Sequence, residues 1–141
     1  MRIYRVTESS AEFEKALEKL LPQLSSSAEI PTSEYIAAML NDKNTHLLAA
    51  EIDGATVGIL SLVIVNIPTG RKAWIEDVVV DSDCRGQNIG FKLVEKAKEV
   101  AMNLGVKKIY LTSNPARQAA HLLYAKCGFE KYDTTLFRIL L

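Results

Sequence analysis

A short polar loop between three valines and a helical pattern has the residue types that bind phosphate. Residues 78–80 are β-branched and apolar, and Arg85, Gly86 and Gly90 follow in a segment that opens an amphipathic helix. Glycines let the backbone approach an anion closely, while unpaired N–H groups and the helix dipole attract it. Glycines that serve only packing in a strand–helix turn are the alternative. The loop that we predict to bind a diphosphate consists of Arg85, Gly86, Gln87, Asn88, Ile89 and Gly90.

Two carboxylates, Glu76 and Asp77, lie just before the valines. A carboxylate inside a β-branched run must be hydrogen-bonded, paired with a positive charge or turned toward a cleft. Adjacent residues of a strand point to opposite faces of the sheet, so only one of the two is expected to enter a cleft. The alternatives are a functional carboxylate in a cleft and a pair of surface charges at the strand edge.

The elements that must position these residues follow from the spacing of apolar side chains. Asp53-Gly54 is a strong hairpin signal, because both turn positions need positive φ. Asn114 followed by Pro115 is typical of a helix start. The strands on either side of the helix at 89–104 need a crossover connection, so we expect them to be parallel. The expected strands are residues 3–6, 46–52, 55–65, 73–80, 107–112, 129–132 and 135–140, and the expected helices are residues 13–24, 32–40, 89–104 and 115–126.

Length and composition place the chain, residues 1–141, in one globular domain. Lys and Arg together number 17, as do Asp and Glu, and this zero net charge argues against a broad basic surface for nucleic acid. No apolar run is long enough to span a membrane, and the N-terminus lacks the apolar stretch of a signal peptide. Two cysteines without a CxxC motif fit a reducing cytoplasm. We expect a cytoplasmic protein without a metal, because no His or Cys set completes a site at Asp81 and Asp83.

These motifs resemble those of the GNAT superfamily, the acetyl-CoA-dependent N-acetyltransferases. The segment 85–90 matches the family pattern Arg/Gln-x-x-Gly-x-Gly/Ala at its first and last places, with Asn88 at the middle glycine. Asn is the non-glycine residue that best tolerates the left-handed backbone conformation, so this departure is mild. Tyr124 followed by Gly128-Phe129 is similar to the motif that closes the family's last helix. The run 76–80 is similar to that of glucosamine-phosphate acetyltransferases.

The resemblance implies an α/β (α+β) fold, in which four helices flank a mixed, mostly antiparallel sheet of about seven strands. Its fourth and fifth strands are parallel and splay apart to receive acyl-CoA. The resemblance also implies that acetyl-CoA is the co-substrate and that backbone groups at 85–90 hold its pyrophosphate. The residues implied to contact the pantetheine arm are Val78, Val79 and Val80 through their main chain, and either Asn114 or Arg117.

The resemblance further implies the chemistry. Tyr124 is implied as the acid that protonates the departing thiolate, and a tyrosine packed on the core is the alternative. Glu76 is implied as the base for an amine that arrives as an ammonium ion, with Asp77 as a substrate contact. The implied reaction is direct transfer of acetyl to a primary amine of a small molecule, such as a polyamine or an amino sugar. A protein or peptide N-acetyltransferase and a non-catalytic acyl-CoA-binding module are the alternatives.

A dinucleotide-binding fold is disfavoured, because the full GxGxxG spacing is missing and an antiparallel meander does not fit repeated strand–helix–strand units. The expected partner is a small-molecule amine, and neither nucleic acid nor a membrane is expected. GNAT members often dimerise through C-terminal strands, and residues 135–140 are apolar enough to form a homodimer in this way.

Overall fold

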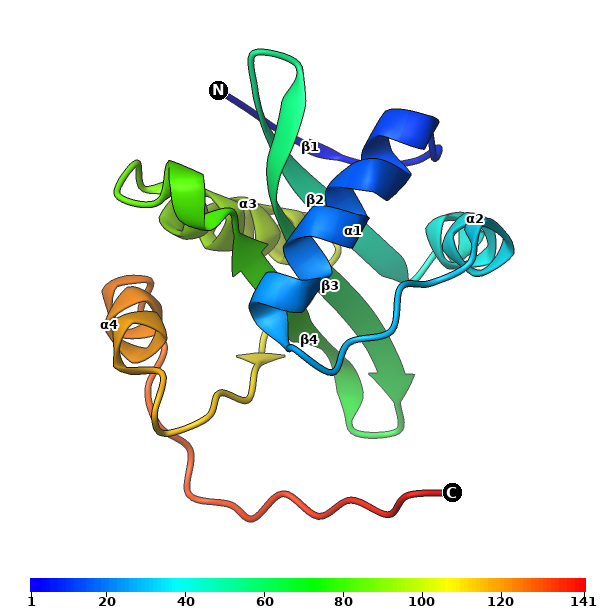
Figure 1. Ribbon diagram of the computed structural model, residues 1–141. Coiled ribbons are helices and arrows are strands. Elements are labelled where there is room, and N and C mark those ends of the chain that lie inside the picture. The colour runs from blue at the N-terminus through cyan, green and yellow to red at the C-terminus, as the bar shows by residue number, and fades with distance from the viewer.

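The computed structural model describes residues 1–141 as a five-stranded mixed sheet in the order β1-β2-β3-β4-β5, with helices on both faces (Figure 1). The first four strands are antiparallel neighbours, and β5 runs parallel to β4. The strands are β1 (Arg2–Arg5), β2 (Thr45–Ile52), β3 (Ala55–Ile67), β4 (Gly70–Val80) and β5 (Ile109–Tyr110). The helices are α1 (Ala11–Leu24), α2 (Ser33–Asn41), α3 (Ile89–Asn103) and α4 (Gln118–Lys126), with a 3-10 turn at Ser82–Cys84.

Helices α1 and α2 begin at side-chain caps and cover one face of the sheet. Ser10 accepts a hydrogen bond from the N–H of Phe13, and Thr32 accepts one from the N–H of Tyr35. Such caps satisfy N–H groups that the first helical turn leaves without partners. The apolar stripe of α1 then packs with α2 and with one face of the strands. Figure 1 shows α1 crossing this face of the sheet.

Helix α3 covers the opposite face and carries the larger core. Its buried residues recur at helical spacing and pack against the strands together with Tyr124 of α4 and Cys127, which follows that helix. Gly58 on β3 lets this helix approach the sheet, since a Cβ there would lie 3.3 Å from side-chain atoms of Ile89 and Leu93. The start of α3, and with it the predicted diphosphate loop that precedes this helix, is therefore held close to the sheet.

A β-bulge interrupts β4 at Asp77. Ser61 of β3 faces Glu76 and Ile59 faces Val79, so one residue of β3 lies opposite two residues of β4. Asp77 takes up the extra length in the left-handed conformation, with φ 51°. The bulge breaks the alternation that the sequence predicts, so Ile75 packs beneath α3 whereas Val79, four residues later, packs beneath α1.

Two expectations about the C-terminal third were wrong. The sheet has five strands instead of about seven, because residues 129–132 and 135–140 pair with no strand. Helix α4 begins at Gln118 instead of residue 115, because the Asn114 side chain accepts from the N–H of Ala116 at 2.9 Å. That bond closes a tight turn before the helix instead of capping it.

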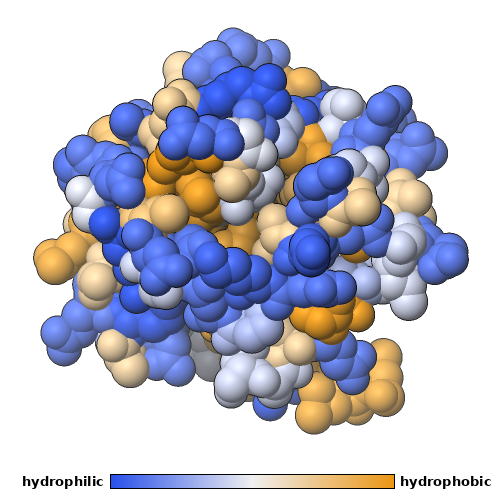
Figure 2. All heavy atoms as spheres, turned by 45° about the horizontal axis from the view of Figure 1, so that its top comes forward, coloured by the Kyte–Doolittle hydropathy of each residue, from blue (hydrophilic) through white to orange (hydrophobic).

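The surface facing the viewer in Figure 2 is mostly hydrophilic, and apolar residues show between the polar ones in a hollow near its middle. None of the helices combines the length and the apolar character needed to cross a membrane.

We expect the two substitutions Asp77→Val and Asp77→Gly to separate the role of the backbone at the bulge from that of the side chain. A β-branched residue is strained in the left-handed region, so Asp77→Val should lower the free energy of unfolding by about 1–2 kcal/mol. Asp77→Gly should retain the wild-type stability or exceed it. Urea unfolding of the three proteins measures this, and equal destabilisation by both variants would contradict a conformational cause.

Candidate active site

Strands β4 and β5 pair only briefly and then separate. Ala73 pairs with Ile109 and Trp74 with Tyr110, and beyond this point one edge of β4 has no neighbouring strand. That edge forms a wall of a cavity of about 510 Å³, together with the end of α1 and the start of α4. Seven residues predicted from the sequence line it: Val78, Val79, Val80, Arg85, Gly90, Arg117 and Tyr124.

The loop before α3 offers a run of free backbone donors. No N–H group from Arg85 to Phe91 donates a hydrogen bond within the chain. Gly86 and Asn88 are both left-handed, with φ 84° and 60°, which aligns successive N–H groups in a way that suits an anion. The loop and α4 line a second cavity of about 400 Å³, which shares Arg85 and Gly90 with the first.

Gly90 has a packing role of its own in this loop. A Cβ at Gly90 would lie 3.1 Å from the Cδ2 atom of Leu123 on α4, so a larger residue would require the end of the Leu123 side chain to shift. Of the six residues predicted for the loop, Gln87 lines neither cavity. Gly86 is different from Gly90, because nothing lies within 4 Å of a Cβ built there. Its left-handed conformation, rather than crowding, favours glycine.

Tyr124 lies in the last turn of α4, is 7% exposed and lines the larger cavity. Its ring packs edge to face against Phe129, with 6.0 Å between ring centroids. Burial raises the pKa of the Tyr124 hydroxyl above its ordinary value of about 10, and the nearby Arg117 opposes this in part. The phenol is therefore protonated at neutral pH and can donate a proton into the cavity.

Glu76 and Asp77 lie on β4 just before the valines, and both side chains are exposed. Neither lines the cavity. Partial burial, and then the charge of Asp77, raise the pKa of Glu76 above its ordinary value. Glu76 follows Trp74 by two residues on the same stretch of strand, so both side chains project from the face that α1 covers.

The structure places Asn114 and Arg117 differently relative to the larger cavity. Asn114 is exposed, and its side chain and carbonyl are engaged in the turn before α4, where the carbonyl lies 3.0 Å from Nε2 of His121. Arg117 lines the larger cavity beside Tyr124. Arg117 is therefore placed to reach a molecule in the cavity, whereas Asn114 shapes the backbone that leads to it.

Gln23 at the end of α1 is a site residue that the sequence did not reveal. Its Oε1 accepts from the N–H of Ser82 at 2.8 Å, and its Nε2 lies 3.5 Å from Oδ1 of Asp81. The amide thus connects α1 to the turn that leads into the loop at residues 85–90. More than fifty residues separate Gln23 from Asp81 and Ser82, and no local sequence pattern predicts such a contact.

Asp81 stands at the centre of this connection and is 4% exposed. Its Oδ2 lies 2.7 Å from Nζ of Lys19, and its Oδ1 accepts from the N–H of Asp83 at 3.1 Å. The hydrogen bond from Lys19, followed by that from Asp83, lowers the pKa of Asp81 below its ordinary value. The carboxylate therefore stabilises the folded state at all but acid pH.

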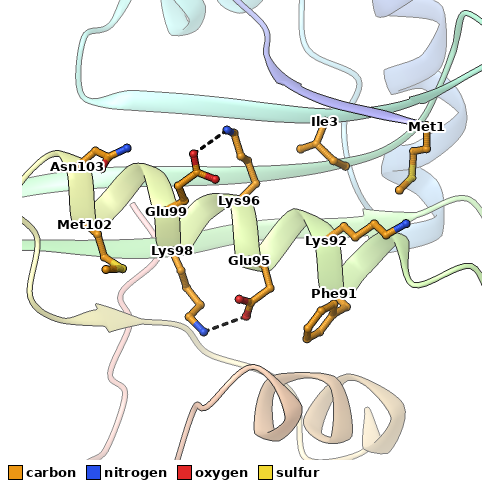
Figure 3. Close-up of a pocket in the computed structure, with 10 residues that line it drawn as sticks. All are labelled: Met1, Ile3, Phe91, Lys92, Glu95, Lys96, Lys98, Glu99, Met102 and Asn103. Atoms are coloured by element: carbon orange, nitrogen blue, oxygen red, sulfur yellow. Dashed lines mark hydrogen bonds and ion pairs between the residues drawn. The ribbon is translucent and has the colours of Figure 1, made fainter.

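Another cavity, of about 660 Å³, lies elsewhere and holds no predicted site residue (Figure 3). It is open to solvent on the outer face of α3, beside β1. The charged side chains along this helix pair with each other there, Lys96 with Glu99 and Lys98 with Glu95. No group of three or more His, Cys, Asp or Glu residues is arranged to hold a metal ion.

The family model described as Acetyltransferase (GNAT) family matches residues 12–129, which is most of the chain. The chain therefore belongs to the GNAT family and is an acyltransferase. Members of this family use acetyl-CoA as co-substrate.

Curated relatives agree with this assignment. A probable glucosamine 6-phosphate N-acetyltransferase of Oryza sativa subsp. japonica is 31% identical over 131 residues, which cover 85% of this chain and 77% of that protein. The aminoalkylphosphonate N-acetyltransferase of Salmonella typhimurium is 34% identical over 98 residues, which cover 67% of this chain and 63% of the relative.

Solved structures share the fold over almost the whole chain. An aminoglycoside acetyltransferase from an uncultured soil metagenomic sample has a TM-score of 0.86 at 21% identity, covering 99% of this chain and 96% of that chain. Glucosamine-6-phosphate N-acetyltransferase from Arabidopsis thaliana has a TM-score of 0.78 at 23% identity, covering 98% and 97%. At these identities the likeness concerns the fold alone.

We expect Asp81→Asn to lower the melting temperature by a few degrees at pH 7, because it removes the charge that holds Lys19. The pKa of Asp81 is depressed in the folded state, so its stabilisation is present above the ordinary Asp pKa and is lost as the pH falls through the folded value. The difference from wild type should therefore shrink below about pH 4. Thermal unfolding followed by circular dichroism from pH 2 to 8 measures this.

Asp83→Asn is the matched control, because Asp83 is mostly exposed and lies 3.7 Å from the same lysine. An exposed pair contributes little, so this variant should melt with the wild type. Equal effects of the two variants would assign the stabilisation to general surface charge.

Proposed function

We propose that this chain transfers the acetyl group of acetyl-CoA to the primary amine of a small molecule, by direct attack with both substrates bound. The observation that carries the proposal is the cavity between the free edge of β4 and helix α4. Free N–H groups lie at one end of it and the protonated Tyr124 lies within it. Binding of an acyl-CoA alone would require no proton donor in that place.

The residues present fit acetyl-CoA. The two adjoining cavities share Val80, Arg85 and Gly90, so an extended molecule can run from the diphosphate loop to Tyr124. The N–H groups of residues 85–90 and the Arg85 guanidinium bind the pyrophosphate. The free edge of β4 at residues 78–80 pairs with the pantetheine arm in the manner of an added strand, and Arg117 contacts the same arm. When bound, acetyl-CoA supplies an activated acetyl thioester.

Glu76 acts as the general base in this proposal. An amine reaches the enzyme mainly as an ammonium ion and must lose a proton before it can attack. Glu76 lies on the strand that borders the cavity, and the raised pKa makes it a better proton acceptor than an ordinary glutamate. Asp77 beside it contacts the substrate and attracts the positively charged amine.

Two further groups complete the proposed transfer. A main-chain N–H near Val79 stabilises the negative charge that develops on the carbonyl oxygen, a contribution of about 3 kcal/mol. Tyr124 then gives its proton to the departing thiolate of coenzyme A, which makes the thiol the leaving group. Burial supports this role, because it keeps the phenol protonated.

The names of several relatives support a small amine as the acceptor. Their printed names include glucosamine 6-phosphate, aminoalkylphosphonate and aminoglycoside acetyltransferases. We therefore propose a primary amine on a small polar molecule, and amino sugars, aminoalkylphosphonates, aminoglycosides and polyamines make up the panel to screen. Acetylation of a peptide lysine or N-terminus, with no activity on this panel, would redirect the proposal to a protein substrate.

Tyr124→Phe should lower kcat by about 100-fold or more, because it removes the proton donor to the thiolate. The affinity for acetyl-CoA should change less than about twofold, since the ring still packs against Phe129. Steady-state kinetics with the best acceptor of the panel and calorimetric titration with acetyl-CoA measure the two quantities. Unchanged turnover would remove Tyr124 from the acid role.

Arg85→Glu is the reverse control, because it alters the diphosphate loop and leaves Tyr124 in place. Its affinity for both acetyl-CoA and CoA should fall by about tenfold or more, since a carboxylate replaces the guanidinium beside the phosphates. No binding of either CoA species by the wild type would end the proposal.

Glu76→Gln should depress the rate most at low pH, where the ammonium ion is hardest to deprotonate. Without the base, the reaction depends on the fraction of free amine, which falls tenfold per pH unit below the amine pKa. The wild type keeps its base ionised until the pH falls to the raised pKa of Glu76. A pH–rate profile from pH 5 to 9 measures this, and parallel profiles for the two proteins would show that Glu76 is not the base.

A further inference from the structure

Two aromatic side chains lie on the sheet without contributing to either hydrophobic core. Trp74 of β4 pairs with Tyr110 of β5, and their rings contact each other with 5.3 Å between centroids. Both residues are only partly buried, and neither belongs to or packs against the two cores. Aromatic rings supply much of the apolar area that proteins bury, so a partly uncovered pair two residues before Glu76 indicates a surface that receives part of a ligand.

A third ring extends this surface. Tyr132, in the segment after α4, contacts Tyr110 edge to face with 6.0 Å between ring centroids, and it is 71% exposed. Three segments that are distant in the sequence thus each supply one ring, and Trp74, Tyr110 and Tyr132 together form an aromatic platform. The CH groups of a sugar ring or of an alkyl chain can pack on such a platform.

A lysine lies over two of these rings. The Nζ atom of Lys72 is 5.9 Å from the ring centroid of Trp74 and 5.3 Å from that of Tyr110. Lys72 forms no ion pair within the chain. Contact with the rings holds its ammonium in place, and its N–H donors are available to an anion. The neighbouring Arg71 differs, because it already donates to a side-chain amide and to a main-chain carbonyl, at 2.8 Å each.

The platform lies between a positive and a negative side chain. Lys72, Trp74 and Glu76 alternate along β4 with Ala73 and Ile75, which belong to the core beneath α3. The three therefore project together from the opposite face, with Lys72 on one side of Trp74 and Glu76 on the other. Four residues of a strand span about 13 Å. Both charged side chains are long and can turn toward each other, so a molecule of the size of a substituted sugar ring can reach both.

We propose that the acceptor is a zwitterionic amine, whose ammonium lies at Glu76, whose carbon skeleton packs on the aromatic platform, and whose anionic group pairs with Lys72. This inference rests on the proposed transfer to a small amine, in which Glu76 takes the proton. A polycationic amine fits less well, because Lys72 repels a further ammonium group. Lys72 and the platform thus determine which amines are accepted and take no part in the transfer of the acetyl group.

Steady-state kinetics with matched amines test the anionic subsite. Glucosamine 6-phosphate is compared with glucosamine, and 3-aminopropylphosphonate and 4-aminobutyrate are each compared with propylamine, so that only the anionic group changes. In at least one comparison the anionic amine should have a kcat/KM about tenfold higher or more, because hydrogen bonds between charged groups contribute that much. Spermidine, which carries further ammonium groups, should be a poorer substrate than the preferred anionic amine.

Lys72→Gln should raise the KM for the preferred anionic amine by about tenfold and change kcat less than about twofold, because the lost contact is equal in the ground state and the transition state. The effect on the matched amine without the anionic group should be several-fold smaller. Lys107→Gln is the matched control, since Lys107 is exposed and its substitution removes the same charge. This control should behave as the wild type, and equal losses with both members of a comparison would overturn the proposal.

The fluorescence of Trp74, the single tryptophan of the chain, gives a reading that does not depend on turnover. Titration with each of the three anionic amines, with and without CoA, should change the emission for the preferred one. The half-saturating concentration should rise about tenfold in Lys72→Gln. Such binding would support the anionic subsite even without acetylation, a result that would contradict only the proposed reaction.

Two results would overturn the zwitterionic acceptor. Acetylation at equal rates with and without the anionic group would do so while leaving the proposed acetyl transfer in place. An unchanged emission of Trp74 with all three anionic amines would do so as well, because a molecule on the platform must contact this ring.

Discussion

The separation of β4 from β5 is the constraint on which the site depends. A parallel pair that stayed together would satisfy the backbone of β4 on both sides and leave no room beside it. Here the pairing stops after Trp74, and the edge of β4 that follows is open to the cavity. The bulge at Asp77 adds to this effect, because it rotates the last residues of β4 relative to Ile75. Strand β4 thereby packs against both hydrophobic cores and still has a free edge.

The elements around this opening are held by contacts between segments that are distant in sequence. Asp81 and Gln23 connect the turn after β4 to the end of α1, and Gly90 lets α4 approach the start of α3. These contacts fix the loop at residues 85–90 relative to Tyr124 without involving the side chains proposed for proton transfer. Positions that support the site and positions that react are thus separate in this chain. Substitutions at the supporting positions should change the stability, whereas those at the reacting positions should change the turnover.

Much of the fold could be predicted because its signals are local. The Asp53-Gly54 turn, the apolar period of residues 89–104 and the crossover between β4 and β5 were all confirmed. The loop at 85–90 was predicted from its glycines, and Asn88 indeed adopts the left-handed conformation that its type tolerates. Local signals failed for Asn114 and for residues 135–140. Asn114 resembled a helix cap, yet its side chain closes a turn three residues earlier. The apolar run 135–140 read as a strand, yet no neighbour within the chain pairs with it.

The sequence by itself determined the order and the type of most elements, the family, and the residue types available for proton transfer. These features depend on the types and spacing of residues that are close together in the chain. Only the tertiary structure decided which of them meet. It placed Arg117 rather than Asn114 beside the cavity, kept Glu76 and Asp77 outside its lining, and added Gln23 to its wall. It also buried Tyr124, which raises the pKa of its hydroxyl. Such outcomes depend on the packing of segments far apart in the chain, and no local pattern encodes the distance between them.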